Sequence, residues 1–241
     1  MLPVEVLNPN RGGPLVLTCE HASCAIPLEY DDLGLDTEEI REHIGWDIGA
    51  RAVTEALATA FDATAVLSGV SRLVIDCNRD LADHDLIVTE SHGVRIPGND
   101  GIDAAERQRR IRDFYQPYHE TIDAVLGKQR DALLFSVHSF TPKLNGRPRR
   151  FDAGVLFDEH AAAAERFGQA LADAGFKVRY NEPYSGLDGL IFSARTHGQR
   201  HGLCYLELEL NNGLLREAAA AQAVADRVAT ALRHVMERPC D

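Results

Sequence analysis

The chain of 241 residues is 45% hydrophobic and 26% charged, values typical of a soluble globular protein, which exclude disordered, collagen-like and coiled-coil architectures. Its length allows one large core, so we expect a single catalytic domain over residues 1–241. The formal net charge of −12 argues against a nucleic-acid partner, because phosphate binding depends on clustered Lys and Arg.

The cysteines and the apolar runs indicate the compartment. The five cysteines are odd in number and form no CxxC pair, so we expect reduced thiols. The first residues show no basic segment followed by a long apolar one, and no run approaches the roughly 18 apolar residues of a membrane span. These features predict a cytoplasmic protein without a membrane partner.

Hydrophobic periodicity predicts alternating strands and helices along the chain. In the first half of the chain we expect a strand over 14–19, a capping pattern from Thr37, a helix over 47–61, strands over 63–67 and 73–75, and a long helix over 103–130 with a kink or a break at Pro117. In the second half we expect strands over 132–137 and 154–157, a helix over 160–174, strands over 177–180 and 204–210, and a helix over 214–236. This order favours an α/β fold, a three-layer α/β/α domain with a mixed, largely parallel twisted sheet.

Two histidines come at the ends of predicted strands, where open parallel sheets bind ligands. His21 follows the strand 14–19 and His138 follows the strand 132–137. Either histidine alone would more commonly be an ordinary hydrogen-bonded residue, but two at one edge suit catalytic zinc, which takes three protein ligands and water. The third ligand is Asp47 or Glu20, and the opposite facing of adjacent strand residues favours Asp47.

Two carboxylates, Glu207 and Glu209, share one face of the strand 204–210, with leucines on the other face. A general base must lie within hydrogen-bond reach of the water that it activates, and Glu209 is nearer the end of the strand. For Glu207, an edge strand with a solvated acidic face is an equally simple explanation.

An anionic substrate would be repelled by the net charge, so a local cation is required to bind it. Arg79 follows the predicted strand 73–75, and its guanidinium can hold a carboxylate in a bidentate manner. Arg72 could do the same, although an arginine before a strand is more commonly solvated or ion-paired. The nucleotide-binding and nucleophile motifs GxGxxG, GxxxxGK[ST] and GxSxG do not occur.

An ordered set of motifs between about residues 14 and 216 resembles the N-formylglutamate amidohydrolase family. The motifs are Cys19-Glu20-His21-Ala22-Ser23 with Ile26-Pro27, Gly45-Trp46-Asp47-Ile48-Gly49-Ala50, Ser71-Arg72 with Asp76-Cys77-Asn78-Arg79, Tyr115-Gln116-Pro117-Tyr118-His119, His138-Ser139-Phe140, Asn181-Glu182-Pro183-Tyr184-Ser185 and Leu208-Glu209-Leu210. Each motif is weak by itself, whereas the set in this order is specific.

The resemblance implies a fold similar to zinc carboxypeptidases and aspartoacylase, a Zn²⁺ cofactor, and hydrolysis of the N-formyl or N-acyl C–N bond of a small anionic acylamino acid such as N-formylglutamate, in amino-acid catabolism and histidine degradation. It implies His21 and His138 as metal ligands, Asn78 and Arg79 at the substrate carboxylate, and Glu209 as the catalytic glutamate. With the candidates taken from the residues themselves, the expected site is His21, Asp47 and His138 for the metal, Glu209 and Arg79 for catalysis, and Asn78, Arg79, Arg72 and Ser139 for the substrate.

The sequence departs from the family pattern in two places. No HxxE follows His21, which leaves the third metal ligand open, and Asn211 and Gly213 occupy positions where the family usually has an arginine and an aspartate. Two other functions stay open at this point: a metal-binding or ligand-binding protein without turnover, and a metallopeptidase acting on short peptides or cell-wall fragments. Activity on a panel of N-acylamino acids separates these hypotheses.

Overall fold

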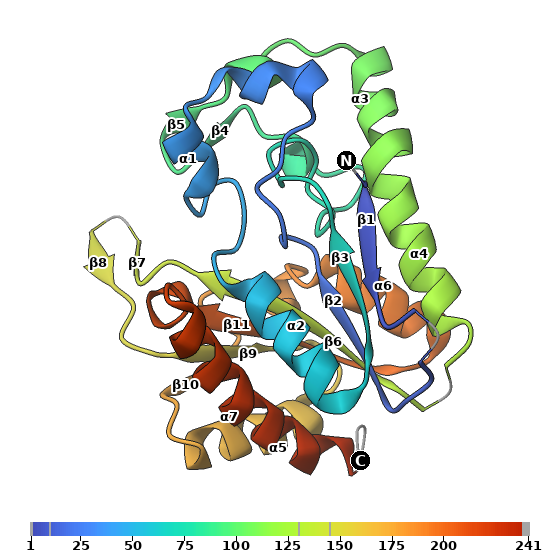
Figure 1. Ribbon diagram of the computed structural model, residues 1–241, viewed down its shortest axis with the longest axis vertical. Coiled ribbons are helices and arrows are strands. Elements are labelled where there is room, and N and C mark those ends of the chain that lie inside the picture. The colour runs from blue at the N-terminus through green and yellow to red at the C-terminus, as the bar shows by residue number, and fades with distance from the viewer. Residues whose placement is uncertain (1, 10, 130, 145, 238–241) are drawn as a thin grey trace.

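A seven-stranded sheet forms the centre of the structure (Figure 1), a computed structural model that describes residues 2–9, 11–129, 131–144 and 146–237. Its strands, in spatial order, are β1 (Val4–Leu7), β3 (Thr64–Ser68), β2 (Leu15–Cys19), β6 (Leu133–Phe140), β11 (Cys204–Asn211), β9 (Ala153–Leu156) and β10 (Val178–Tyr180). The central strands β3, β2, β6 and β11 are parallel, whereas β1 is antiparallel to β3 and β9 to β11. The mixed, largely parallel sheet is the one predicted.

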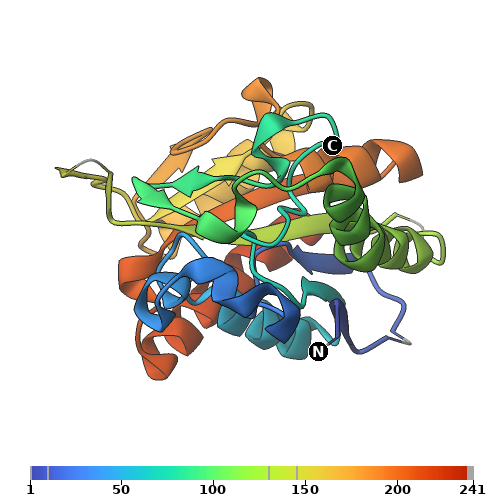
Figure 2. The same ribbon diagram turned by 90° about the horizontal axis from the view of Figure 1, so that it is seen from above.

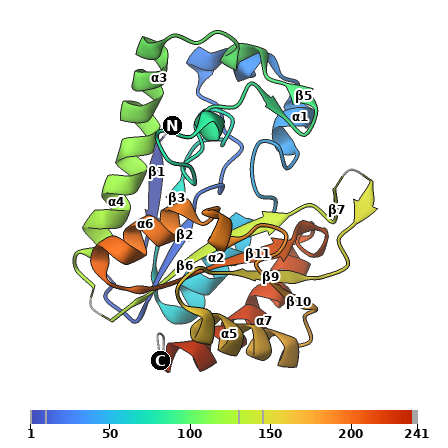
Figure 3. The ribbon, with the colours of Figure 1, turned by 180° about the vertical axis from the view of Figure 1, so that it is seen from behind.

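Helices cover both faces of this sheet. On one face, α2 (Ala50–Phe61), α5 (Ala161–Asp173) and α7 (Ala218–Met236) bury apolar residues of the strands in one hydrophobic cluster. On the other face, α4 (Gln116–Leu126) and α6 (Phe192–His201) pack with a second cluster, and Figure 3 shows α6 across that side. This arrangement confirms the three-layer α/β/α architecture.

The alternation of side chains along β6 and β11 decides which polar groups face the second layer. The leucines of β11 at 206, 208 and 210 belong to the cluster beneath α5 and α7, so Glu207 and Glu209 lie on the opposite face. His138 pairs with Glu209 in the parallel register of β6 and β11, and Ser136 pairs with Glu207. The expectation that the two glutamates share a face is confirmed, and both are buried.

One predicted strand is absent: residues 73–75 form a turn. Their side chains are buried in the second cluster, so the apolar run reflects burial rather than strand pairing. Side chains satisfy the backbone instead, since Arg110 Nη1 donates to the carbonyl of Val74 at 3.0 Å and Asn99 Nδ2 to that of Leu73 at 2.8 Å. Asn78 and Arg79 therefore follow a buried turn and not a strand.

Two helices differ from their predicted bounds. The helix predicted from Asp47 begins at Ala50, because Gly49 at φ 82° ends the preceding turn. The stretch predicted over 103–130 contains α3 (Ala104–Arg110), a π-helical turn (Ile111–Tyr115) and α4, and the backbone stays helical through both junctions. Pro117 follows the π-helical turn, which is a common way for a helix to accommodate an interrupted hydrogen-bond ladder.

The other predicted elements are confirmed to within a few residues, although β6 continues past His138 to Phe140. The short helix α1 (Thr37–Arg41) begins at a capping box of Asp36 and Glu39, as the pattern at Thr37 indicated. Two elements, β1 and α6, were not predicted from the sequence.

Two small hairpins extend from the same side of the molecule (Figure 2). They are formed by β4 (Glu90–Ser91) with β5 (Val94–Arg95), and by β7 (Lys143–Leu144) with β8 (Arg147–Pro148). Within the described ranges, no helix combines the length and apolar character that a membrane crossing requires.

Candidate functional site

The carboxyl ends of β2, β6 and β11 meet at one edge of the sheet because these strands are parallel neighbours. β2 ends at Cys19 and releases His21 into the turn that follows, β6 carries His138, and β11 carries Glu209 opposite it. The sequence-predicted histidines and glutamate are therefore brought to one place.

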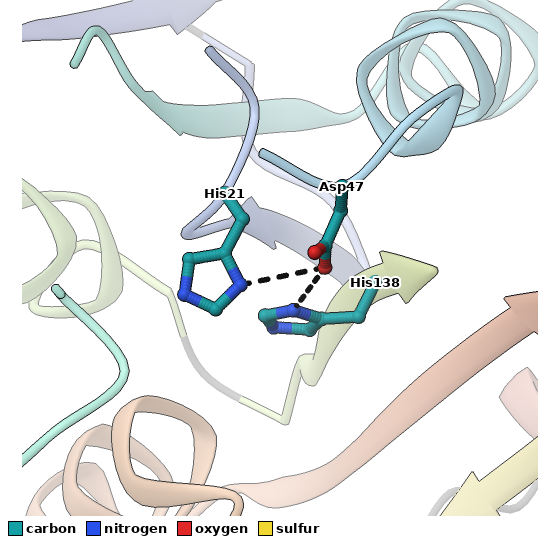
Figure 4. Close-up of side chains that lie close together, drawn as sticks. All are labelled: His21, Asp47 and His138. Carbon is teal, nitrogen blue, oxygen red and sulfur yellow. Dashed lines mark hydrogen bonds and ion pairs between the residues drawn. The ribbon is translucent and has the colours of Figure 1, made fainter. Parts of the chain in front are cut away.

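Asp47 lies between the two histidines (Figure 4). Its Oδ2 atom is 2.9 Å from Nδ1 of His138 and 3.4 Å from Nδ1 of His21, and the two imidazole centroids are 4.8 Å apart. One donor atom from each of the three residues falls within 4.8 Å of the others, and all three side chains are buried. Two imidazole nitrogens and a carboxylate oxygen form a donor set suited to a divalent metal such as zinc.

Each of the two histidines contacts a further carboxylate through its Nε2 atom. Asp76 Oδ1 is 2.7 Å from Nε2 of His21, and Glu20 Oε2 is 3.0 Å from Nε2 of His138. Metal-binding histidines commonly donate their second ring N–H to a carboxylate, which fixes the tautomer and the ring orientation. In both rings the contact at Nε2 leaves Nδ1 as the nitrogen directed at Asp47.

Glu20 is part of the site, but it contacts Nε2 of His138, on the side of the ring that faces away from Asp47. Glu20 and His21 both follow the end of β2 in a turn, so the alternation of strand residues does not separate them. The Glu20 carboxylate also accepts hydrogen bonds from Tyr118 at 3.0 Å and Ser136 at 2.6 Å. These contacts occupy the carboxylate that competed with Asp47 in the sequence analysis.

The site contains more negative than positive charge. Five carboxylates are buried there, those of Glu20, Asp47, Asp76, Glu207 and Glu209. Burial raises the pKa of Glu207 to about 7, and burial with the nearby Asp47 raises the pKa of Glu209 well above its ordinary value. Oε2 of Glu209 is buried and accepts no hydrogen bond. A divalent cation at His21, Asp47 and His138 would fit this excess of negative charge.

His138 and His43 respond differently to their surroundings. Burial alone would lower the pKa of His138, but the carboxylates of Glu207, Asp47 and Glu20 raise it well above its ordinary value. Burial lowers the pKa of a third imidazole, His43, to about 4, so that ring is neutral.

The predicted substrate-binding residues line a pocket of about 310 Å³ beside the donor set. Arg72 is already engaged, since Nη1 lies 3.3 Å from Asp47 and Nη2 lies 3.1 Å from Asp76. Among the described residues, the nearest carboxylate to Arg79 is that of Asp83 at 3.9 Å, and Nη1 lies 3.5 Å from the carbonyl of Asn78, which leaves most of the guanidinium available to a ligand.

The other two predicted substrate-binding residues are engaged by the protein. Asn78 donates to Glu207 at 3.4 Å and accepts from the backbone of Ser193 at 2.9 Å. Ser139 donates through its hydroxyl to the carbonyl of Ile48, and its backbone N–H donates to Asp47. Both residues reach the pocket wall, and these contacts hold neighbouring groups in position.

Several pocket residues were missed by the sequence analysis as candidates: Asp76, His43, His92 and Tyr184. Asp76 lies two residues before Asn78 and three before Arg79, both of which were singled out, and this proximity was the available signal for it. His43 is four residues before Asp47, and its Nδ1 lies 3.6 Å from Oδ1 of that residue. His92 and Tyr184 come from distant loops, and only the fold brings them to the pocket.

Comparison with known proteins agrees with the motif order. Residues 13–216 match the sequence profile described as N-formylglutamate amidohydrolase. A crystal structure of a gene product from Agrobacterium tumefaciens is similar over 98% of this chain and 96% of that chain, with 32% sequence identity and a TM-score of 0.93. N-formylglutamate amidohydrolase from Ralstonia eutropha shares the fold over 98% of both chains, with 18% identity and a TM-score of 0.69. A search among curated proteins found no significant match.

Proposed function

The chain belongs to the N-formylglutamate amidohydrolase family and is a hydrolase of amide bonds, and from this premise we propose that it is a zinc-dependent enzyme that cleaves the N-formyl or N-acyl C–N bond of a small acylamino acid. We further propose that residues 1–241 act as one catalytic domain. A cytoplasmic location and a place in histidine degradation stay predictions of the sequence.

The observation that carries this proposal is the arrangement around Asp47. Two histidine Nδ1 atoms face one carboxylate, each histidine is backed by a second carboxylate, and Glu209 lies on the adjacent strand with an unpaired oxygen. His21, Asp47 and His138 would hold the metal. When bound, zinc would polarise the acyl carbonyl and lower the pKa of the attacking water to about 7.

Glu209 is proposed as the general base and acid. Its carboxylate takes a proton from the attacking water, whose oxygen bonds to the acyl carbon, and passes that proton to the nitrogen as the C–N bond breaks. The products are a carboxylate, formate in the case of an N-formyl substrate, and the free amino acid. Arg79 is proposed to hold the α-carboxylate of the substrate, because within the described part of the chain its planar guanidinium has no carboxylate closer than that of Asp83 at 3.9 Å.

Metal analysis and turnover together test this function. The purified protein is expected to contain close to one zinc per chain and to release formate from N-formylglutamate or a related N-formylamino acid. A chelator should abolish turnover, and added zinc should restore it. His21→Ala and His138→Ala should each remove the metal, so full zinc occupancy in both variants would contradict the ligand assignment. Stoichiometric ligand binding without product would identify a binding protein.

A further inference from the structure

Arg149 carries a second available guanidinium next to the pocket. It directly follows β8, and its backbone N–H donates to the carbonyl of Pro142 at 2.8 Å, which closes the base of the β7–β8 hairpin. The guanidinium lies 5.5 Å from the ring centroid of Phe140 and 5.7 Å from that of Tyr184. Tyr184 lines the pocket, and Phe140 is two residues beyond His138 on β6.

The position of this guanidinium is fixed by the protein, while much of its binding capacity is unused. Nη1 of Arg149 donates to the carbonyl and to the hydroxyl of Thr141, both at 3.2 Å. Among the described residues, Nε and Nη2 of Arg149 have no hydrogen-bond partner and no carboxylate pairs with the side chain. A guanidinium that is held in place loses little conformational entropy when it binds a carboxylate in a bidentate manner.

The segment that carries Arg149 is also held against the end of β11. Asn211 Nδ2 donates to the carbonyl of Phe151 at 3.1 Å, and the rings of Phe151 and Phe140 lie 4.8 Å apart. Between residues 139 and 151 the sequence contains no acidic residue. The charge of Arg149 is therefore not neutralised by its own loop.

The charge of Arg149 reaches two residues of the pocket wall. Burial raises the pKa of Tyr184 and the nearby Glu209 adds to the rise, whereas Arg149 opposes it. Burial lowers the pKa of His92, and the guanidiniums of Arg72 and Arg149 lower it further. Both residues lie in the pocket lining, and the distance of 5.7 Å between the guanidinium of Arg149 and the ring centroid of Tyr184 places that guanidinium beside the pocket.

From this geometry we infer that Arg149 is a specificity residue, which binds a second carboxylate carried by the side chain of the acylamino acid. The inference rests on the proposed function, with Arg79 holding the α-carboxylate. Arg72 cannot take this role without giving up Asp47 and Asp76, to which it is already bound. The substrate class that fits two available guanidiniums is an N-acylated dicarboxylic amino acid.

Paired substrates and a matched variant test the inference. N-formylglutamate and N-formylglutamine have nearly the same shape and differ in the charge of the side chain. The wild-type enzyme should prefer N-formylglutamate in kcat/KM by about ten-fold or more, the range of a charged hydrogen bond. Arg149→Gln should lower kcat/KM for N-formylglutamate by about ten-fold or more. The kcat/KM for N-formylglutamine should stay within about two-fold of the wild-type value, so that the preference disappears.

Arg150→Gln is the control, because it removes the same charge from the next residue, which is exposed. It should keep the wild-type preference. Equal loss of both substrates in Arg149→Gln would make the residue structural and overturn the inference, as would an unchanged preference in that variant. A wild-type enzyme that hydrolyses both substrates equally would also overturn it while leaving the proposed function intact. If the zinc-loaded wild type hydrolyses neither, the proposed function fails and the inference fails with it.

Discussion

The Oε2 atom of Glu20 lies 3.0 Å from Nε2 of His138, and the opposite nitrogen of the same ring lies 2.9 Å from Asp47. The two carboxylates thus contact opposite edges of one imidazole. Only Asp47 also faces Nδ1 of His21, whereas Glu20 is occupied by Tyr118 and Ser136. This difference supports Asp47 as the proposed metal ligand and Glu20 as a residue that would orient His138.

Isosteric substitutions test that separation. Asp47→Asn should remove most of the bound zinc, because a neutral amide replaces a charged donor. Glu20→Gln should keep a zinc site whose affinity is lower by about 10–100-fold, the usual effect of losing a residue that orients a ligand. Competition with a chromophoric chelator measures both affinities. The reverse order, with Asp47→Asn binding zinc more tightly than Glu20→Gln, would assign the ligand role to Glu20.

Arg79→Lys tests the anchor for the α-carboxylate. A lysine keeps the positive charge but loses the planar pair of donors, so KM should rise by an amount equivalent to about 1.5–3 kcal/mol while zinc content stays constant. Steady-state kinetics with N-formylglutamate gives the comparison. Arg112→Lys, at an exposed residue paired with Asp113, is the control and should leave KM unchanged. An unaltered KM in Arg79→Lys would move the anchor elsewhere.

The order of strands and helices could be predicted because each element carries its own hydrophobic period. The parallel order of β2, β6 and β11 then places His21, His138 and Glu209 together without further information. Asp47 could be predicted as a candidate but not chosen with certainty, since the choice relied on Glu20 belonging to a strand. In the structure Glu20 lies in a turn, where strand alternation does not apply.

Other features depend on contacts between distant segments and leave no local pattern. The run Leu73-Val74-Ile75 has the composition of a strand, yet Arg110 and Asn99 from later segments satisfy its carbonyls in a buried turn. The guanidinium of Arg149 likewise lies beside Tyr184, which comes from a distant segment, and no residue near Arg149 in the sequence indicates that neighbour. Periodicity reports burial of a residue, but it does not identify the partner that buries it.

A pair of stacked imidazoles outside the pocket predicts a pH dependence of stability. His119 Nδ1 lies 2.8 Å from Nε2 of His197, and burial, with the neighbouring His197, lowers the pKa of His119 to about 3. The folded protein thus keeps His119 neutral, whereas the unfolded chain takes up a proton below about pH 6.5. The contribution of His119 to the free energy of unfolding is therefore fully present above about pH 6.5. It is lost progressively as the pH falls from 6.5 towards 3.

His119→Asn should remove this dependence while keeping an amide donor for His197. Between pH 6.5 and 5, the free energy of unfolding of the wild type should fall by about 1.5 kcal/mol more than that of the variant. Urea titrations at several pH values measure the difference. His84→Asn, at a side chain that is 91% exposed, serves as the control and should follow the wild type. Parallel pH curves for wild type and His119→Asn would refute the assignment.

Glu209 and Glu207 provide a matched pair for testing the catalytic base. They share one face of β11, both are buried, and they lie two residues apart, which is about 6–7 Å along a strand. Glu207 contacts Asn78 at 3.4 Å and His138 at 3.6 Å, whereas Oε2 of Glu209 accepts no hydrogen bond. Glu209, with an oxygen that has no hydrogen-bond partner among the described residues, is therefore the proposed base.

Glu209→Gln should lower kcat by at least 10²–10⁴-fold, roughly the contribution of general acid–base catalysis, because an amide cannot take the proton of the attacking water or return it to the departing nitrogen. Zinc content and KM should change little, since the amide keeps the shape of the side chain and none of the three proposed metal ligands is altered. Glu207→Gln should retain most of the turnover. Single-turnover formate release, measured with zinc content on the same samples, separates loss of chemistry from loss of metal. An inactive Glu207→Gln beside a normally active Glu209→Gln would transfer the role of base to Glu207.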